Sequence, residues 1–292
     1  MDCKEIELKI NGQTRMTAVI GNPIKHSLSP FIHNRAFELT DENGIYTAWE
    51  IGEEDLGQVM KNIKSLNMYG LNVSMPYKKA VMDHVDYLTD EAKLIGAVNT
   101  VTNFDGELIG HNTDGIGFFK ALESEGYSVE NQEITVLGGG ATAMAIIVQA
   151  MLLKGKQINV FARKSDSFEP LQEQLAHFEK ENIHLYDLAD VHELQGKINS
   201  SSLLVNATSS GMERGQMPLS DKINLPSPII VADIIYKNEK TDLLQWAENQ
   251  GVSTSNGLGM LLYQAAESFA MWTGKQMPVN QIEKELINEI NH

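Results

Sequence analysis

Polar residues able to do chemistry gather in four short segments of the first 114 residues. Two serines stand in "HSLSP", a serine and a lysine in "NVSMPYK", an asparagine in "AVNT" and an aspartate in "HNTDG". An ammonium group beside a carboxylate can move a proton or stabilise developing negative charge, and hydroxyls and amides can hold a polar ligand. Taken singly, each has an ordinary explanation: Ser29 can cap a helix, Asp114 can form an Asx turn and Lys78 can be a solvated lysine. Together they follow predicted strand ends, where ligand crevices form in open α/β sheets.

A second candidate site is the glycine-rich stretch "ITVLGGGATAMAIIVQAMLLKG", which predicts a strand, a turn and an apolar helix in that order. Gly138, Gly140 and Ala143 match G-x-G-x-x-A. The first glycine permits the tight turn, the second lets backbone N–H groups approach a pyrophosphate, and the alanine keeps the helix close to the strand. The helix would direct its positive end at the phosphates. This context favours dinucleotide binding over a merely structural glycine turn.

The end of the following strand, "INVFARKSD", bears on which dinucleotide is used. An acidic residue at this position binds the 2′-hydroxyl of NAD, and a basic residue accepts the 2′-phosphate of NADP. Arg163 and Lys164 favour NADP, while Asp166, slightly later, keeps NAD open. The alternative is that both cations are solvated loop charges.

The elements that must position these residues alternate between strand-like and helix-like segments along the whole chain, which is typical of α/β architecture. In the first half, "TAVIGNP", "YTAWEI" and "GLNVSM" predict strands, and "AVNTVTNFDGELIGHNTD" predicts a hairpin turning at Asp105-Gly106. Between the first two strands, "SLSPFIHNRAFEL" predicts a helix with Ser29 as its N-cap. From "EITVLGGG" onward a run of βα units predicts a second, mostly parallel sheet. Two helical segments near the C-terminus could pack back on the first domain.

Composition narrows the class of protein. The 292 residues include 39 acidic and 23 basic ones, a net charge of −16, which argues against nonspecific nucleic-acid binding and docking on an anionic membrane. A single cysteine, Cys3, cannot form an internal disulfide, and no Cys/His cluster predicts a metal site. The beginning of the chain does not read as a secretory signal, and the most apolar stretch is too short to span a bilayer. We therefore expect a cytoplasmic protein without a metal.

These blocks, in their order and spacing, resemble the shikimate dehydrogenase family. The resemblance rests on "GNPIKHSLSPFIHN", "NVSMPYK", "AVNT", "NTDG", "LGGGATA", "NATSSGM", "DIIY" and "GLGMLLYQA", and covers nearly the whole chain. "NVSMPYK", "LTDEAKLIGAVNT" and "WTGK" are most similar to the branch that includes quinate/shikimate dehydrogenases. The resemblance implies a two-domain α/β fold with a cleft between the domains. The N-terminal substrate domain would comprise residues 1–113 plus 257–292, and the Rossmann-type NAD(P)-binding domain residues 114–256.

The resemblance also implies a role for each matching residue. Lys78 and Asp114 would be the catalytic pair beside the reacting oxygen. Ser27 and Ser29 would hold the substrate carboxylate. The rest of the substrate pocket would come from Ser74, Asn99, Tyr236 and Gln264. The cofactor would be held by Gly138, Gly139, Gly140, Ala141, Thr142, Ala143, Arg163, Lys164, Asn206, Thr208, Gly259 and Met260.

The implied reaction is the reversible NAD(P)H-dependent reduction of 3-dehydroshikimate to shikimate, on the pathway to chorismate and the aromatic amino acids. Family members that use NADP usually carry N-R-T after the second Rossmann strand, where this chain has Ala162, Arg163 and Lys164. Three alternatives stay open: NAD in place of NADP, quinate as the main substrate, and a dinucleotide-sensing module without turnover. We expect a monomer or homodimer.

Overall fold

The computed structural model describes residues 9–178, 182–237 and 240–290, so Cys3 lies outside the described residues. The chain divides into two compact units, Met1–Thr113 with Leu262–His292 and Asp114–Leu261. We call them unit 1 and unit 2. The resemblance placed the second boundary before residue 257, where helix α9 (Gly257–Thr273) begins, whereas the change of unit falls within this helix.

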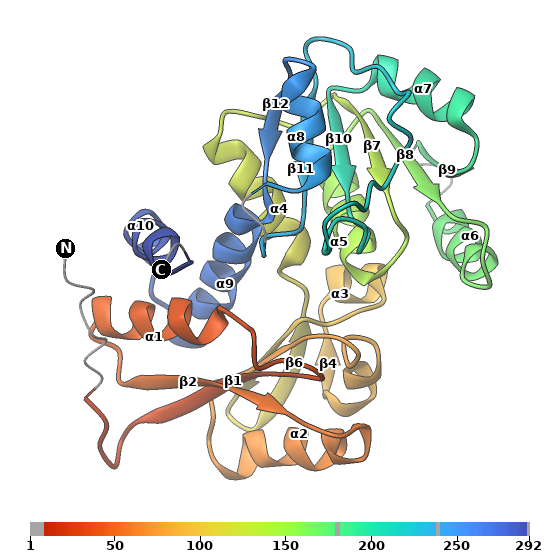
Figure 1. The fold of residues 1–292 in the computed structure, drawn as a ribbon. Helices are drawn as coiled ribbons and strands as arrows, with labels where there is room; N and C mark the ends of the chain where they lie inside the picture. Colours follow the sequence, from red (N-terminus) through yellow and green to blue (C-terminus); the bar gives the residue numbers. More distant parts are fainter. Residues whose placement is uncertain (1–8, 179–181, 238–239, 291–292) are drawn as a thin grey trace. The chain divides into compact units, whose positions relative to one another are not determined.

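Unit 1 is built on a six-stranded mixed sheet in the order β2-β1-β3-β5-β6-β4 (Figure 1). Its strands are β1 (Arg15–Gly21), β2 (Gly44–Glu50), β3 (Gly70–Val73), β4 (Tyr87–Leu88), β5 (Thr100–Phe104) and β6 (Glu107–His111). Strands β2 and β3 both pair in parallel with β1, whereas β5 runs antiparallel to β3 and to β6. The predicted hairpin is β5–β6, and its turn residues Asp105 and Gly106 have the positive φ angles, 50° and 90°, that a tight turn requires.

The two faces of this sheet bury different side chains. Residues alternate along a strand, so Leu71 and Val73 face a core that includes helix α2 (Leu56–Ser65), with Met60 and Ile63. Asn72, between them on β3, belongs to the opposite face. There lie helix α1 (Ser29–Leu39), which contacts β2, and the C-terminal helices α9 and α10 (Val279–Ile290). Short helical segments η1 (Glu53–Asp55), η2 (Ala80–His84) and α3 (Asp90–Ile95) complete the unit.

The C-terminal helices return to unit 1 as predicted. The indole of Trp272 donates a hydrogen bond to the carbonyl oxygen of Val101 at 3.0 Å. Arg35 on α1 pairs with Glu285 on α10, and the guanidinium is almost fully buried. These contacts pack helices α9 and α10 against α1 and β5 of unit 1. The two C-terminal helices therefore complete unit 1 without adding a strand to its sheet.

Unit 2 is a doubly wound sheet of six parallel strands in the order β12-β11-β10-β7-β8-β9. The strands are β7 (Glu133–Leu137), β8 (Gln157–Ala162), β9 (Ile183–Asp187), β10 (Leu203–Asn206), β11 (Ile230–Asp233) and β12 (Ser253–Ser255). Its helices are α4 (Asp114–Ser124), α5 (Ala141–Leu152), α6 (Phe168–Ala176), α7 (Val191–Ser200), α8 (Asp242–Asn249) and the first residues of α9. Numbered along the chain, the strand order is 3-2-1-4-5-6, the dinucleotide-binding arrangement, with its switch point between β7 and β10.

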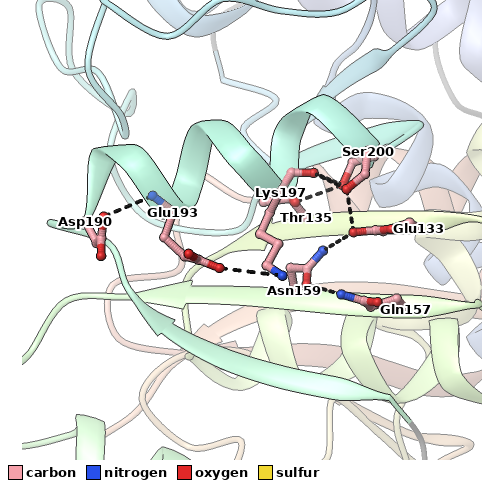
Figure 2. A network of polar contacts seen from close by, with 9 residues as sticks. Glu133, Thr135, Gln157, Asn159, Asp190, Glu193, Lys197 and Ser200 are labelled. Atoms are coloured by element: carbon pink, nitrogen blue, oxygen red, sulfur yellow. Dashed lines mark hydrogen bonds and ion pairs between the residues drawn. The ribbon is translucent and has the colours of Figure 1, made fainter.

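A polar network ties helix α7 to the amino ends of β7 and β8 (Figure 2). The Glu133 carboxylate accepts hydrogen bonds from Ser200 Oγ at 2.7 Å and from Asn159 Nδ2 at 3.0 Å. The glycine turn lies at the opposite, carboxyl end of β7. Because ligands bind at the carboxyl ends of parallel strands, this network stabilises the sheet and is remote from the predicted cofactor site.

Candidate active site

Three of the predicted polar segments meet at one edge of the unit 1 sheet. Strand β3 ends at Val73, whose N–H donates to the carbonyl of Asn99 at 2.8 Å, and the N–H of Asn99 donates to the carbonyl of His111 at 3.1 Å. The N–H of Ser74 donates to Ile20 on β1, at 2.8 Å. The pairing directions put the carboxyl ends of β1, β3 and β6 beside the start of β5. The sheet therefore positions Ser74, Asn99 and the "HNTD" segment together.

Lys78 is held at this edge through its main chain. It follows the cis peptide between Met75 and Pro76, and its carbonyl accepts a hydrogen bond from the N–H of Val98 at 2.8 Å. Its neighbour Tyr77 is buried, with its hydroxyl hydrogen-bonded to the carbonyl of Ile51. The backbone around Lys78 is thus anchored to the segment that carries Asn99.

The two predicted carboxylate-binding serines differ in their surroundings. Ser27 Oγ accepts a hydrogen bond from the N–H of Ser29 at 3.2 Å, which leaves its own proton for another acceptor. Ser29 is buried and is the first residue of α1. The prediction that it caps this helix is wrong, because the capping position belongs to Leu28, which makes no side-chain capping bond. The early proline is accommodated in the first turn, where its missing N–H costs no helical bond.

A buried network behind this edge fixes the orientation of two amides. Asn72 Nδ2 lies 3.2 Å from the carbonyl oxygen of Asn99, which can only accept, so the amide oxygen of Asn72 must face Tyr46. The Tyr46 hydroxyl donates to that oxygen at 2.7 Å, and burial raises the pKa of Tyr46 well above its usual value. On Asn99, the side-chain oxygen accepts from the N–H of Thr113 at 2.8 Å and its Nδ2 donates to Thr113 Oγ1 at 3.0 Å. Thr113 immediately precedes Asp114, so these bonds hold the residue directly before the predicted catalytic aspartate.

Ser268 on α9 joins this network and was not singled out by the sequence. Its hydroxyl donates to the carbonyl of Gln264 at 3.0 Å and lies 2.8 Å from Thr100 Oγ1. Asn72 Nδ2 donates to it at 3.1 Å. The side chain of Ser268 is fully buried. The turn of helix that carries Gln264 is therefore fastened to β3 and β5.

His33 on α1 is an unusual neighbour of the network. Its ring stacks on Tyr46 with centroids 4.3 Å apart, and in the described part of the chain neither ring nitrogen has a hydrogen-bond partner. Complete burial lowers the pKa of His33 to about 3, so the ring is neutral at physiological pH. It acts as an aromatic packing residue behind Tyr46.

In unit 2, the glycine turn has room for a ligand at one position only. Gly138 has φ +118°, and a Cβ there would lie 2.8 Å from the carbonyl oxygen of Ala207. A Cβ on Gly139 would lie 2.3 Å from Leu171, whereas one on Gly140 would meet nothing within 4 Å. Ala143 is fully buried in α5, which begins with Ala141 and Thr142. The turn therefore fits a pyrophosphate approaching Gly140 and the first N–H groups of α5.

Arg163 and Lys164, which are predicted to bind the 2′-phosphate of NADP, directly follow β8. Arg163 is exposed, and no ion pair involves it among the residues that the structure describes. Lys164 Nζ lies 3.6 Å from Asp187 Oδ2, at the end of the neighbouring strand β9. A surface pocket next to it is lined by Lys164, Ser165, Asp166, Phe168, Glu169 and Gln172. The two predicted cations are thus unequal, since one of them is paired.

Asn206, the last residue of β10, and Thr208, in the loop that follows, lie at the switch point. The Asn206 amide donates to Ser210 O at 2.9 Å and to Asp233 Oδ1 at 3.1 Å, while its oxygen accepts from Thr208 N at 3.1 Å and Oγ1 at 2.7 Å. All four of its hydrogen-bonding positions are occupied. The Asn206 side chain therefore stabilises the conformation of the loop that follows β10 through its bonds to Thr208 and Ser210.

Asp233 is the charged centre of this region and was also not singled out by the sequence. Besides Asn206, it accepts hydrogen bonds from the N–H of Ile235 at 3.1 Å and from Thr241 Oγ1 at 2.8 Å. Burial raises the pKa of Asp233, although all three donors favour its charged form. It ties the loops after β10 and β11 together, and the second of these loops leads to Tyr236, whose pKa is also raised by burial.

Gly259 and Met260 stand in the first turns of α9, within unit 2. A Cβ on Gly259 would lie 2.8 Å from Cβ of Ala121 on α4, so the glycine allows these two helices to pack closely. Among the described residues, no helix is long and apolar enough to cross a bilayer, and no group of three or more His, Cys, Asp or Glu side chains could hold a metal ion.

Unit 2 is a Rossmann unit with an open glycine turn. Unit 1 is an α/β unit with hydroxyls, amides and a lysine along one edge of its sheet. Together these features define a dinucleotide-dependent oxidoreductase with a separate substrate domain. Comparisons with known proteins specify the class further. A family model described as "Shikimate dehydrogenase substrate binding domain" matches residues 19–101, and "Shikimate 5'-dehydrogenase C-terminal domain" matches residues 257–287. The chain is 54% identical to "Shikimate dehydrogenase (NADP(+))" of Lactococcus lactis subsp. cremoris (strain MG1363), over 97% of this chain and 100% of the relative. It belongs to the shikimate dehydrogenase family.

Two solved structures are similar over nearly the full length. The shikimate 5-dehydrogenase of Listeria monocytogenes, solved in complex with shikimate and NAD, is 40% identical with a TM-score of 0.91, covering 96% of this chain and 99% of the other. The shikimate 5-dehydrogenase of Thermus thermophilus, solved with NADP(H) and shikimate, is 31% identical with a TM-score of 0.83, covering 94% and 99%. The predicted fold class and family are confirmed.

Proposed function

We propose that the chain catalyses the reversible NADPH-dependent reduction of 3-dehydroshikimate to shikimate. Family membership supports the reaction, and the observation that carries the proposal is the convergence at one sheet edge. There, the N–H of Ser74 is bonded to the carbonyl of Ile20, the Lys78 carbonyl accepts the N–H of Val98, and the Asn99 side chain is bonded to Thr113. A dinucleotide-sensing module without turnover would not require this set of polar residues outside the nucleotide-binding unit.

Lys78 and Asp114 are the proposed acid–base pair. The bound nicotinamide supplies the hydride. Lys78 donates a proton to the oxygen that becomes the hydroxyl and stabilises its developing negative charge. Asp114 orients the lysine or the substrate hydroxyl in this proposal, and Thr113, the residue before it, is hydrogen-bonded to the Asn99 side chain.

Substrate recognition falls to hydroxyls and amides in this proposal. Ser27 and Ser29 bind the carboxylate, with Ser27 better prepared because its oxygen already accepts the N–H of Ser29. Ser74, Asn99, Tyr236 and Gln264 hold the ring hydroxyls. Quinate differs from shikimate in one hydroxyl and the ring double bond, so activity with quinate is the finer question of specificity.

The cofactor is NADP in this proposal, with the pyrophosphate at residues 138–143 and the 2′-phosphate at Arg163 and Lys164. Asn206 and Thr208 shape the loop next to the nicotinamide, and Gly259 and Met260 line that end of the site. We expect a cytoplasmic monomer or homodimer.

One assay tests the reaction, the substrate and the cofactor. Absorbance of the reduced nicotinamide is followed with shikimate or quinate as substrate and NADP or NAD as acceptor, which gives four combinations. The proposal expects the highest kcat/KM for shikimate with NADP. Absence of turnover in all four combinations, from protein that binds the dinucleotide, would refute it in favour of a sensing role.

A further inference from the structure

We propose that Asp187 is a specificity-determining residue that limits the preference for NADP over NAD by pairing with Lys164. This inference rests on the proposed function, since it concerns the cofactor of that reaction. Asp187 ends the third Rossmann strand. It therefore lies outside both the fingerprint glycines after the first strand and the basic residues after the second.

Strand pairing places the two charges together. Ala162, the last residue of β8, is the register partner of Asp187, the last residue of β9, and the N–H of Leu188 donates to the Ala162 carbonyl at 2.9 Å. Lys164 follows two residues after this pair. Its Nζ lies 3.6 Å from Asp187 Oδ2. The pair therefore sits at the strand end that meets the 2′ position of the adenosine ribose in this fold.

The carboxylate is the fixed partner and the lysine the movable one. Asp187 Oδ1 accepts a hydrogen bond from the N–H of Ala189 at 2.9 Å, and the side chain is 27% exposed, against 70% for Lys164. A lysine that binds a 2′-phosphate must exchange its carboxylate partner for the phosphate. The exchange reduces the gain from the phosphate contact and leaves Asp187 close to a second anion.

The local charges point the same way. The pocket beside Lys164 is also lined by Asp166 and Glu169, so it offers one cation and two carboxylates. Carboxylates repel a phosphate but accept a hydrogen bond from a ribose hydroxyl. Arg163, which is not ion-paired among the described residues, retains the attraction for NADP. This balance predicts measurable use of NAD beside a preference for NADP.

The test is a double-mutant cycle of Asp187→Asn and Lys164→Met, assayed with shikimate. An asparagine keeps an oxygen to accept the Ala189 N–H while it loses the charge. We expect D187N to raise kcat/KM for NADP about threefold to fivefold, the range that an exposed ion pair sustains, with little change for NAD. K164M should lower kcat/KM for NADP, and D187N should add little in its presence.

Asp190→Asn is the matched control, since it removes the same charge nearby. Asp190 caps α7 by accepting the N–H of Glu193 at 3.0 Å, which an asparagine also does, so its NADP/NAD ratio should remain that of the wild type. Calorimetric titration of NADP and NAD measures the ratio of dissociation constants without turnover. An unchanged ratio in D187N, or an equal gain in the K164M background, would overturn the inference. Failure to oxidise shikimate would instead refute the proposed function, and the titrations would still decide the role of Asp187.

Discussion

Asn72 on β3 and Ser268 on α9 are 196 residues apart in sequence, and the Asn72 amide donates a hydrogen bond to the Ser268 hydroxyl at 3.1 Å. This bond joins the strand that leads to Lys78 with the helix that carries Gln264. Both partners are buried, so the contact is sheltered from competition by water. Helix α9 is thus bonded to the sheet that the first hundred residues help to form.

Removing the Ser268 hydroxyl should loosen this edge without unfolding the protein. In Ser268→Ala, Asn72 keeps two other acceptors, Asn99 O and Thr100 Oγ1. We expect KM for shikimate to rise about threefold to tenfold, because hydrogen bonds worth about 0.5–1.5 kcal/mol each are lost between α9 and the sheet. Steady-state kinetics on both substrates measures the change.

Thr273→Val is the control for this variant. Thr273 makes the same hydroxyl-to-carbonyl bond on the same helix, to Phe269 at 2.8 Å, and its oxygen accepts the N–H of Lys275 at 3.1 Å, so both of these bonds go to residues outside the predicted site. Its KM should stay within twofold of the wild type. Equal effects of the two variants would mean that Ser268 contributes only to helix stability.

Lys78→Ala should lower kcat by about 10²-fold or more with a modest change in KM, the typical loss for a positioned acid–base group. The main-chain bond from Val98 to residue 78 does not depend on the side chain, so the fold should persist. Lys79→Ala, which changes an exposed lysine one residue later, should remain near wild-type activity. Near-normal turnover in Lys78→Ala would remove this lysine from the mechanism.

Ser27→Ala should chiefly weaken substrate binding. The variant loses a hydroxyl whose proton is available to a carboxylate, and it loses the acceptor for the Ser29 N–H. Because bonds to charged groups are the stronger ones, we expect KM for shikimate to rise about tenfold or more, with KM for NADP little changed. An unchanged KM for shikimate would contradict the assignment of Ser27 to the carboxylate.

The glycines at 138 and 140 should respond differently to alanine. Gly138→Ala meets both a positive φ and the Ala207 carbonyl, so thermal denaturation should show a loss of about 1–3 kcal/mol. Gly140 has φ −78° and open space around it, so Gly140→Ala should keep the wild-type Tm. Its methyl group would occupy the space expected for the pyrophosphate, and the Kd for NADP should rise at least tenfold. Unaltered NADP affinity in Gly140→Ala would place the phosphates elsewhere.

His33 should make the free energy of unfolding decrease at acidic pH, and the substitution His33→Phe should reduce this decrease. Its pKa of about 3 in the folded protein lies below its ordinary 6.5, so between these values the unfolded chain binds a proton that the folded chain does not. The free energy of unfolding therefore decreases as pH falls from 6.5, by up to about 5 kcal/mol at the limit. His33→Phe keeps a ring against Tyr46 and should show a shallower decline in urea denaturation between pH 7 and 4. The exposed His192→Gln is the control, and a His33→Phe slope equal to that of the wild type would contradict the argument.

The sequence by itself determined the local elements and the identity of the chemical groups. Alternation and glycine turns are local signals, so the hairpin at Asp105-Gly106, the strand before Gly138 and the helix after Gly140 could be read from a few residues each. The family could also be predicted from the sequence, because short motifs such as "NTDG" are recognised from their own residues without a structure. Ser29 as a helix cap failed, since the first residue of a helix depends on the path of the chain before it.

Tertiary structure alone decided which distant residues share hydrogen bonds. Nothing near Ser268 in the sequence indicates Asn72, and nothing near Asp187 indicates Lys164, because these contacts arise from strand order and helix return. The same holds for Asp233, which accepts a hydrogen bond from Asn206 at the end of β10, 27 residues away in sequence. Side-chain types follow from the sequence, whereas the partners that orient a buried amide or compete for a lysine depend on packing across the whole unit.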